Sequence, residues 1–337
     1  MTAKNLVTIL LGAWLIVGIF VDGFAHTHNK PETFFSPWHA ILYSGFLATA
    51  LWMIWITYQN ANKLGVPFKN GIPTGYGLGI LGVVLFFIGG VCDMTWHIIF
   101  GIEEDIAALL SPSHLLLLVG VLLIITSPYR MGEKELKKSP SFKEFFPTLL
   151  SYTLSVAVLC FFMMYTWAFN HGWVAAKATA LFITDEAVFQ NIIRIGISNT
   201  IITTTFLMVP VYFLLKRWTL PFGSITLMYT VNFVLMTIIR GFENAEVIGI
   251  GVVAGLLADF FIQQKKFTAL AVVLPLFIWV VFYVGIAIFE GMGWDPELWT
   301  GAIVLSTIWS FILHYIISVS ERESEQQSID FNEKNVI

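Results

Sequence analysis

The sequence predicts an all-α protein, a polytopic bundle of helices that crosses a membrane. The 337-residue chain is 57% hydrophobic and 12% charged, with a mean hydropathy of +0.79, whereas soluble domains carry about 25% charged residues. A second observation is that about ten stretches have the roughly 20 apolar residues that a spanning helix needs. These stretches cover approximately residues 5–24, 37–58, 76–99, 112–128, 147–168, 188–215, 221–240, 245–263, 268–290 and 298–319.

Composition also restricts the partners of the chain. A formal net charge of −4 gives no basic surface for nucleic acid, so we expect no nucleic-acid partner. The two cysteines, Cys92 and Cys160, show no pairing pattern and argue against a disulfide framework or a thiolate zinc site. The expected partners are the lipid bilayer and either other membrane subunits or further copies of the chain.

Lysine and arginine are concentrated in alternate connections between the predicted spans, chiefly 129–147, which holds five of them. Basic loops stay on the cytoplasmic side of a membrane. A ten-helix, multi-pass protein of the cell membrane with both termini cytoplasmic accounts for this alternation. The first segment has no small-residue cleavage site and is predicted to be a retained helix.

The basic connection 129–147 is also the clearest internal boundary. It predicts a four-helix part over residues 1–130 and a six-helix part over residues 145–320. The last residues, 321–337, form a polar tail that we expect to be irregular or to lie on the surface.

Two stretches of the N-terminal part share a four-part pattern. Each begins with Asp-x3-His, as Asp22 and His26 in the first and as Asp93 and His97 in the second. Each ends with Ser-Pro-x-His, at residues 36–39 and 111–114. The histidines of the two halves are separated by 12 residues in the first stretch and by 16 in the second. We interpret the two stretches as an internal helix-loop-helix repeat on the extracytoplasmic side.

The spacing suits metal binding. Residues i and i+4 lie on one face of a helix, about 5–6 Å apart at Cβ, so Asp and His of each Asp-x3-His can approach one ion. Ser36 and Ser111 are good N-caps before proline, which places His39 and His114 in the first turn of the returning helix. The positive end of that helix disfavours imidazolium, and neutral imidazole is the form that binds metal.

The pattern therefore predicts two metal sites with three protein ligands each: Asp22, His26 and His39 in one, and Asp93, His97 and His114 in the other. A single histidine at a helix end is usually solvated or hydrogen bonded, and an Asp-x3-His pair can be an ordinary ion pair. Ionisable groups at membrane depth are rare and tend to be functional, however. Because this pattern of aspartate and histidines occurs twice in the same order, metal ligation is favoured over a solvated histidine or a simple ion pair.

The sequence leaves further ligands and the identity of the metal open. His28 is a candidate accessory ligand without a counterpart in the second stretch, and Glu103, Glu104 and Asp105 could add a carboxylate there. Two histidines and one carboxylate suit copper(II), zinc or non-haem iron. Three protein ligands leave a coordination position open, which favours chemistry or exchange over a purely structural role.

These residues resemble the C subunit of the copper-containing membrane monooxygenases, the particulate methane and ammonia monooxygenases. That family binds a metal with Asp-x3-His-x12-His, and Asp22, His26 and His39 match this spacing. The sequences of residues 93–97 and 111–114 are also similar to those around the ligands of that family. The resemblance covers about residues 15–125. The resemblance implies a metal protein like a subunit of a copper monooxygenase, with copper as its metal and with partner subunits. The second set departs from it, with a longer gap and an aspartate.

The six-helix part matches nothing in that family. Arg194, Arg240, Glu243 and Glu290 fall near the predicted outer face, where we expect an ion-pair layer. Arg240 and Glu243 are an i,i+3 pair, and Arg194 needs an acidic partner such as Glu243 or Glu290. Three functions follow for the whole chain: a copper protein within an oxidising enzyme, a protein for uptake, delivery or sensing of copper or zinc, and a structural membrane partner.

Overall fold

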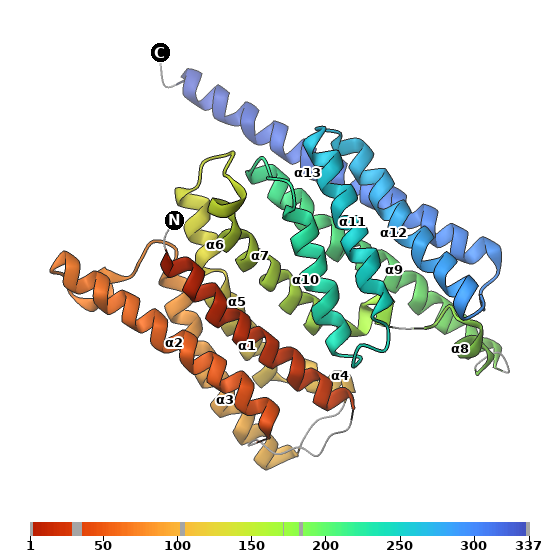
Figure 1. Cartoon of the computed structure of the whole chain (residues 1–337), viewed down its shortest axis with the longest axis horizontal. Coiled ribbons are helices and arrows are strands. Elements are labelled where there is room, and N and C mark those ends of the chain that lie inside the picture. The colour runs from red at the N-terminus through yellow and green to blue at the C-terminus, as the bar shows by residue number, and fades with distance from the viewer. Residues whose placement is uncertain (1–2, 29–35, 102–104, 171, 182–184, 335–337) are drawn as a thin grey trace. The chain divides into compact units, whose positions relative to one another are not determined.

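The computed structural model describes residues 3–28, 36–101, 105–170, 172–181 and 185–334. These residues form helices that are joined by turns and loops. They contain no strand and one isolated antiparallel bridge, between Ala175 and Met292. The all-α prediction is confirmed for this part of the chain (Figure 1). The α-helices are α1 (Ala3–Thr27), α2 (Pro37–Leu64), α3 (Gly77–Phe100), α4 (Asp105–Leu110), α5 (Pro112–Ile125), α6 (Ser127–Glu135), α7 (Phe142–Phe162), α8 (Ala176–Ala180), α9 (Glu186–Arg217), α10 (Ser224–Ile238), α11 (Glu246–Gln263), α12 (Phe267–Phe289) and α13 (Pro296–Lys334).

Nine helical segments of the described chain are long and apolar enough to cross a membrane, and α5 with α6 forms one of them. The expected span at 221–240 is the exception, because α10 has only 15 residues. Its start is delayed by Pro221 and by Gly223, whose φ is +91°, and the chain turns again at Gly241, whose φ is +60°. Glycine adopts these left-handed angles without steric cost. The chain is thus a multi-pass membrane protein with at least one apolar helix that is shorter than a full span.

The chain forms two compact units that do not follow the predicted boundary at 129–147. The first unit contains residues 1–165 and 230–248, and the second contains 166–229 and 249–337. Helix α7 joins the first unit because it packs against α1, α5 and α6. Its Phe161 ring lies edge-on to Phe20 at 5.0 Å between centroids and covers Gly23. Long-range packing of this kind leaves no mark in a local charge pattern.

Glycines bring the helices of the first unit into close contact. A Cβ added at Gly18 of α1 would lie 2.6 Å from Leu42 Cα, and one at Gly45 of α2 would lie 2.7 Å from Leu15 Cα. Helices α3 and α5 approach in the same way, since a Cβ at Gly120 would lie 2.7 Å from Phe86 N. Small residues let helix backbones approach closely where lipid provides no hydrophobic drive. Two tight helix pairs, α1 with α2 and α3 with α5, result from this packing (Figure 1).

The second unit is held by buried polar contacts between its helices. Trp279 Nε1 of α12 donates to Thr204 Oγ1 of α9 at 2.8 Å. The carboxylate of Asp259, which is fully buried in α11, accepts hydrogen bonds from the backbone N–H groups of Ile225 and Thr226 at 3.0 Å. It therefore satisfies the first turn of α10, as a carboxylate at a helix N-terminus does.

The polar tail differs from its expected form. Helix α13 continues from the apolar segment through to Lys334, so residues 321–334 extend a helix. Glutamate and glutamine, which are frequent in this stretch, are good helix formers. This local propensity outweighed the low hydrophobicity on which the expectation was based.

We predict that Gly18→Ala lowers the thermal stability of the protein in detergent. The new methyl group meets the backbone of α2 and forces two packed helices apart, which costs roughly 1–3 kcal/mol in overpacked sites. The matched control is Gly285→Ala on α12, where nothing lies within 4 Å of an added Cβ. The unfolding midpoint should fall by several degrees for Gly18→Ala and stay constant for the control. Equal midpoints would contradict the assigned packing.

Candidate metal centre

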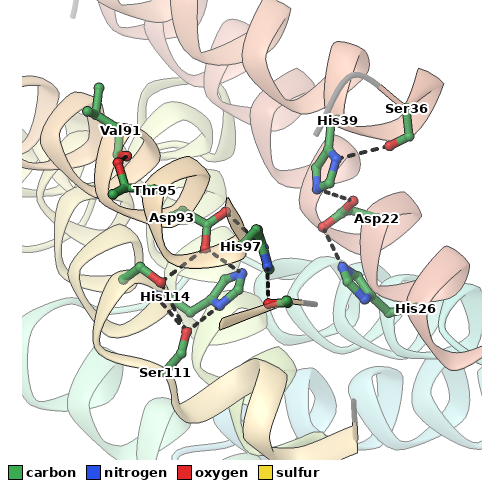
Figure 2. Close-up of polar contacts among 12 residues, drawn as sticks. Asp22, His26, Ser36, His39, Val91, Asp93, Thr95, His97, Ser111 and His114 are labelled. Atoms are coloured by element: carbon green, nitrogen blue, oxygen red, sulfur yellow. Dashed lines mark hydrogen bonds and ion pairs between the residues drawn. The ribbon is translucent and has the colours of Figure 1, made fainter. Parts of the chain in front are cut away.

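The first group of potential ligands is carried by α1 and α2. Helix α1 continues through Asp22 and His26, as the i,i+4 argument requires, and α2 presents His39 in its first turn. His39 Nε2 lies 3.1 Å from Asp22 Oδ1, and His26 Nε2 lies 3.7 Å from Asp22 Oδ2. Figure 2 shows the Asp22 carboxylate between the two imidazoles.

The second group has the same arrangement on α3 and α5. Asp93 and His97 lie one turn apart on α3, and His114 stands in the first turn of α5. The Nε2 atoms of both histidines lie 3.5 Å from oxygens of Asp93 (Figure 2). In each group the three ligand atoms lie within 4.8 Å of one another and could hold a metal ion.

These separations match those of atoms bound to a common ion. Nitrogen and oxygen ligands lie about 2.0–2.2 Å from zinc, so two ligands of a tetrahedral ion are roughly 3.4 Å apart. The four nitrogen-to-oxygen distances span 3.1 to 3.7 Å. A charge-assisted hydrogen bond between imidazolium and carboxylate would be about 2.7–2.9 Å long. Three of the four separations exceed the usual length of an N–H···O hydrogen bond, and each group could hold a cation.

The Nδ1 atoms of the second group contact oxygen atoms, an arrangement that suits a proton on this ring nitrogen. His97 Nδ1 lies 3.3 Å from the carbonyl oxygen of Gly101, which can only accept. Ser113 Oγ donates to Asp93 Oδ1 at 3.0 Å, so its oxygen is left to accept from Ser111 Oγ at 3.1 Å. If the Ser111 proton is used in this contact, His114 Nδ1 is the donor to Ser111 Oγ at 2.6 Å.

In the neutral imidazole a protonated Nδ1 leaves a lone pair on Nε2. In that tautomer the Nε2 lone pairs of His97 and His114 are directed at oxygens of Asp93, which also carry lone pairs, whereas a proton on Nε2 of His97 would be donated to Asp93. Acceptors that face one another repel unless a cation lies between them. Outer contacts of this kind, from the second ring nitrogen to an oxygen, are typical of metal-binding histidines.

The first group contains an even less satisfied carboxylate. Asp22 Oδ1 is buried and accepts no hydrogen bond among the described residues, although His39 Nε2 is only 3.1 Å away. At the position that corresponds to Ser113, the first group has Trp38, so no hydroxyl donates to Asp22 as Ser113 does to Asp93. Buried polar atoms are almost always satisfied. A metal ion would satisfy this oxygen.

The two predicted N-caps behave differently. Ser111 caps α5, since its Oγ accepts from the backbone N–H of His114 at 3.4 Å, while it also contacts the ring of that residue. Ser36 precedes α2 with extended backbone angles but makes no side-chain cap bond. Its Oγ instead contacts His39 Nδ1 at 2.9 Å. The serine of each stretch therefore contacts the imidazole of the returning helix.

His28 lies apart from both groups. Its Nδ1 contacts the carbonyl oxygen of Phe24 at 2.8 Å, and its ring lies against the Phe24 ring at 4.1 Å between centroids. A Cβ added at Gly241 would lie 3.6 Å from His28 Nε2. The ring therefore packs at the end of α1 and is outside the set of converging ligand atoms. Glu103 and Glu104 lie outside the described residues.

The predicted ion-pair layer is present only in part. Arg240 and Glu243 pair at 3.2 Å, and both side chains are well exposed to the surroundings. Arg194 donates to the side chain of Asn191 at 3.0 Å, which is the partner that the structure gives it in place of Glu243 or Glu290. The Glu290 backbone N–H caps the end of α12 by donating to the Ile286 carbonyl. An amide one turn away on the same helix is a sufficient partner for an exposed guanidinium.

Three groups near the candidate ligands were not predicted from the sequence. Ser113 belongs to the Ser-Pro-x-His word, and its place two residues after a cap could have suggested a second hydroxyl contact. Tyr43 follows His39 by one helical turn, a spacing that puts both on one face, and its ring centroid lies 6.1 Å from that of His39. The Gly101 carbonyl had no detectable signal, because any residue provides one.

We compared the chain with models of protein families, with curated proteins and with solved structures, and none of the three comparisons gives a match.

We predict that Ser36→Ala weakens metal binding at the first group without changing the number of ions bound. Loss of a contact that orients a ligand typically costs 10–100-fold in metal affinity. Helix α2 should be preserved, because Ser36 makes no side-chain cap bond. Ser44→Ala is the control, since the Ser44 hydroxyl on the same helix donates to the Ile41 carbonyl and contacts neither metal group among the described residues. Titration against a competing chelator measures both affinities, and an unchanged affinity in Ser36→Ala would refute the orienting role.

Proposed function

We propose that the chain is an integral membrane metalloprotein that binds one ion at Asp22, His26 and His39 and another at Asp93, His97 and His114. The agreement between the nitrogen-to-oxygen separations and the edge of a tetrahedral ligand set carries this proposal. The buried and unsatisfied Asp22 Oδ1 supports it from an independent direction. All six side chains belong to helices that are apolar enough to cross a membrane.

We further propose that the ion is copper. Imidazole nitrogens with one carboxylate suit copper(II), and the resemblance of Asp22, His26 and His39 to the copper membrane monooxygenase pattern favours copper over zinc or iron. The same ligand set is also compatible with zinc and iron. Measuring the metal content of the purified protein distinguishes the three metals. Neither group includes a cysteine among its converging atoms.

The role that we propose is oxidation, with the chain acting as a subunit of a copper-dependent membrane monooxygenase or beside one. When bound, copper supplies one-electron redox chemistry at a coordination position that three protein ligands leave open. The contribution of the chain is to hold the ligands and to limit access of water, since Asp93 is 2% exposed and His39 is 8% exposed. Cytoplasmic termini, extracytoplasmic sites and partner subunits belong to the same proposal.

A second candidate function is metal uptake, delivery or sensing. It is favoured by the uneven exposure of the ligands, because the His26 and His114 side chains retain 22% and 20% of their accessible surface. Ligands that are partly accessible at helix ends allow an ion to exchange with a carrier. Transport through the bilayer is less favoured, because the ligands gather near helix ends whereas transporters bind near the membrane midplane.

We predict that the purified protein binds copper and that His39→Ala combined with His114→Ala abolishes binding. Each substitution removes one of the three ligands that the described residues provide to its group, so both sites lose affinity. His28→Ala is the matched control, because this histidine lies at the end of α1 outside the groups, and its metal content should equal that of the native chain. Elemental analysis after dialysis measures the ions per chain. Unchanged metal content in the double variant would refute both sites.

Oxygen uptake and metal transfer separate the two candidate functions. For an oxidising role, we expect copper-dependent oxygen consumption in membranes with a reductant, and we expect it to be lost in the double variant. For metal handling, we expect copper to move between the protein and a chelator within minutes and no oxygen consumption above that of the variant. Oxygen consumption equal in native and variant membranes would refute the oxidising role.

A further inference from the structure

Helices α2 and α3 of the first unit meet through side chains in matching register. The rings of Phe46 on α2 and Phe86 on α3 stack at 4.6 Å between centroids. One turn farther, a Cβ added at Gly90 of α3 would lie 3.4 Å from Tyr43 Cε1 and 3.8 Å from the Tyr43 hydroxyl. Tyr43 thus lies against the open backbone of Gly90, which provides room for its phenol.

The next turn of each helix carries a proposed metal ligand. His39 precedes Tyr43 by four residues and Asp93 follows Gly90 by three, so each stays on the face that its helix presents to the other. The contact between α2 and α3 therefore brings the two groups next to each other, as Figure 2 shows. Their proximity follows from helical register and does not depend on the loops.

Electrostatic interactions between the groups agree with this geometry. Asp22 of the first group interacts with Asp93 and His97 of the second. His26 interacts with His97 and His114. The Tyr43 hydroxyl interacts with both Asp22 and Asp93, so one side chain is within range of both groups.

We propose that the two groups form a single two-ion centre, with the Tyr43 phenol at their junction, in which an ion bound at one group weakens binding at the other. This inference rests on the proposed metal binding and adds the coupling between the sites. The geometry that carries it is the shared α2–α3 face, on which Tyr43 and Gly90 lie between the aromatic pair and the ligands.

The physical origin of the coupling is charge. Each group offers one carboxylate and two neutral imidazoles to a divalent ion, so each filled site carries one excess positive charge. The second ion carries two charges and meets the excess positive charge of the filled neighbour. At an effective dielectric of about 20, even two unit charges about 10 Å apart would weaken binding by roughly one order of magnitude, so the effect on a divalent ion is at least that large. Because both carboxylates are largely buried, with side-chain exposures of 14% and 3%, salt screens this repulsion little.

Titration of the detergent-solubilised full chain with Cu²⁺ tests the proposal. The native chain should take up two ions in two steps whose dissociation constants differ by at least roughly tenfold. Asp22→Asn and Asp93→Asn should each bind one ion. One of these variants keeps only the group that fills second in the native chain. This group should bind its ion at least roughly tenfold more tightly than in the native second step, because the neighbouring ion is absent. Thermal unfolding of both variants establishes that they are folded.

Electron paramagnetic resonance of the same samples gives an independent readout. The fully loaded native chain should show dipolar broadening and a half-field transition, which each single-site variant should lack. Coupling strong enough for mutual exclusion would appear as one ion in the native chain and one in each variant, and this result also supports the proposal.

Other results would overturn it. Two native steps of equal affinity, with a native spectrum equal to the sum of the two variant spectra, would show that the sites are independent. One ion in the native chain and none in one of the folded variants would show that only one group is a site. If neither the native chain nor any variant bound copper, the proposed metal binding itself would be refuted. This outcome differs from a failure of the coupling, in which the native chain still binds copper.

Discussion

The first unit contains two largely buried carboxylates, Asp22 and Asp93, each of which is placed where it could help to hold a cation. Asp22 and Asp93 each face two imidazole Nε2 atoms at distances suited to a common ligand shell. Burying such a group without a partner would be costly in a protein interior and more so in a bilayer. The surrounding structure is consistent with that role: glycine contacts draw the helix pairs together, and serine hydroxyls and a carbonyl orient the rings. A metal ion would link these features in one physical explanation.

The parts of the site that follow from local physics could be predicted from the sequence. The i,i+4 spacing of Asp22 and His26 places these two side chains on one face of α1. The Ser-Pro sequence before His39 places the third side chain in the first turn of α2. The same local reasoning could not foresee that Ser36 would contact an imidazole, since a cap bond and a ring contact compete for one hydroxyl. It also could not place Tyr43 against Gly90, because that contact depends on how two helix pairs dock.

The fold shows the same division between local and long-range causes. Apolar length predicts most of the helices, and the missing full-length span at 221–240 is explained by backbone turns at Gly223 and Gly241. The grouping of α7 with the N-terminal helices depends on ring packing of Phe161 at Gly23 and Phe20. A contact of this kind joins residues about 140 positions apart, so neither charge runs nor loop lengths encode it.

The end of α1 shows how a distant segment can support the first group. Thr27, the residue after His26, donates to the carbonyl oxygen of Ile239 at 2.9 Å. Gly241 lies against the Phe24 ring, where a Cβ would be 3.0 Å from Cε2. A helix end frays unless its last turn is held, and this is the turn that carries His26. Residues 239–241 therefore restrain a proposed ligand that they do not touch, which gives a physical reason for residues 230–248 to belong to the same unit as the metal groups.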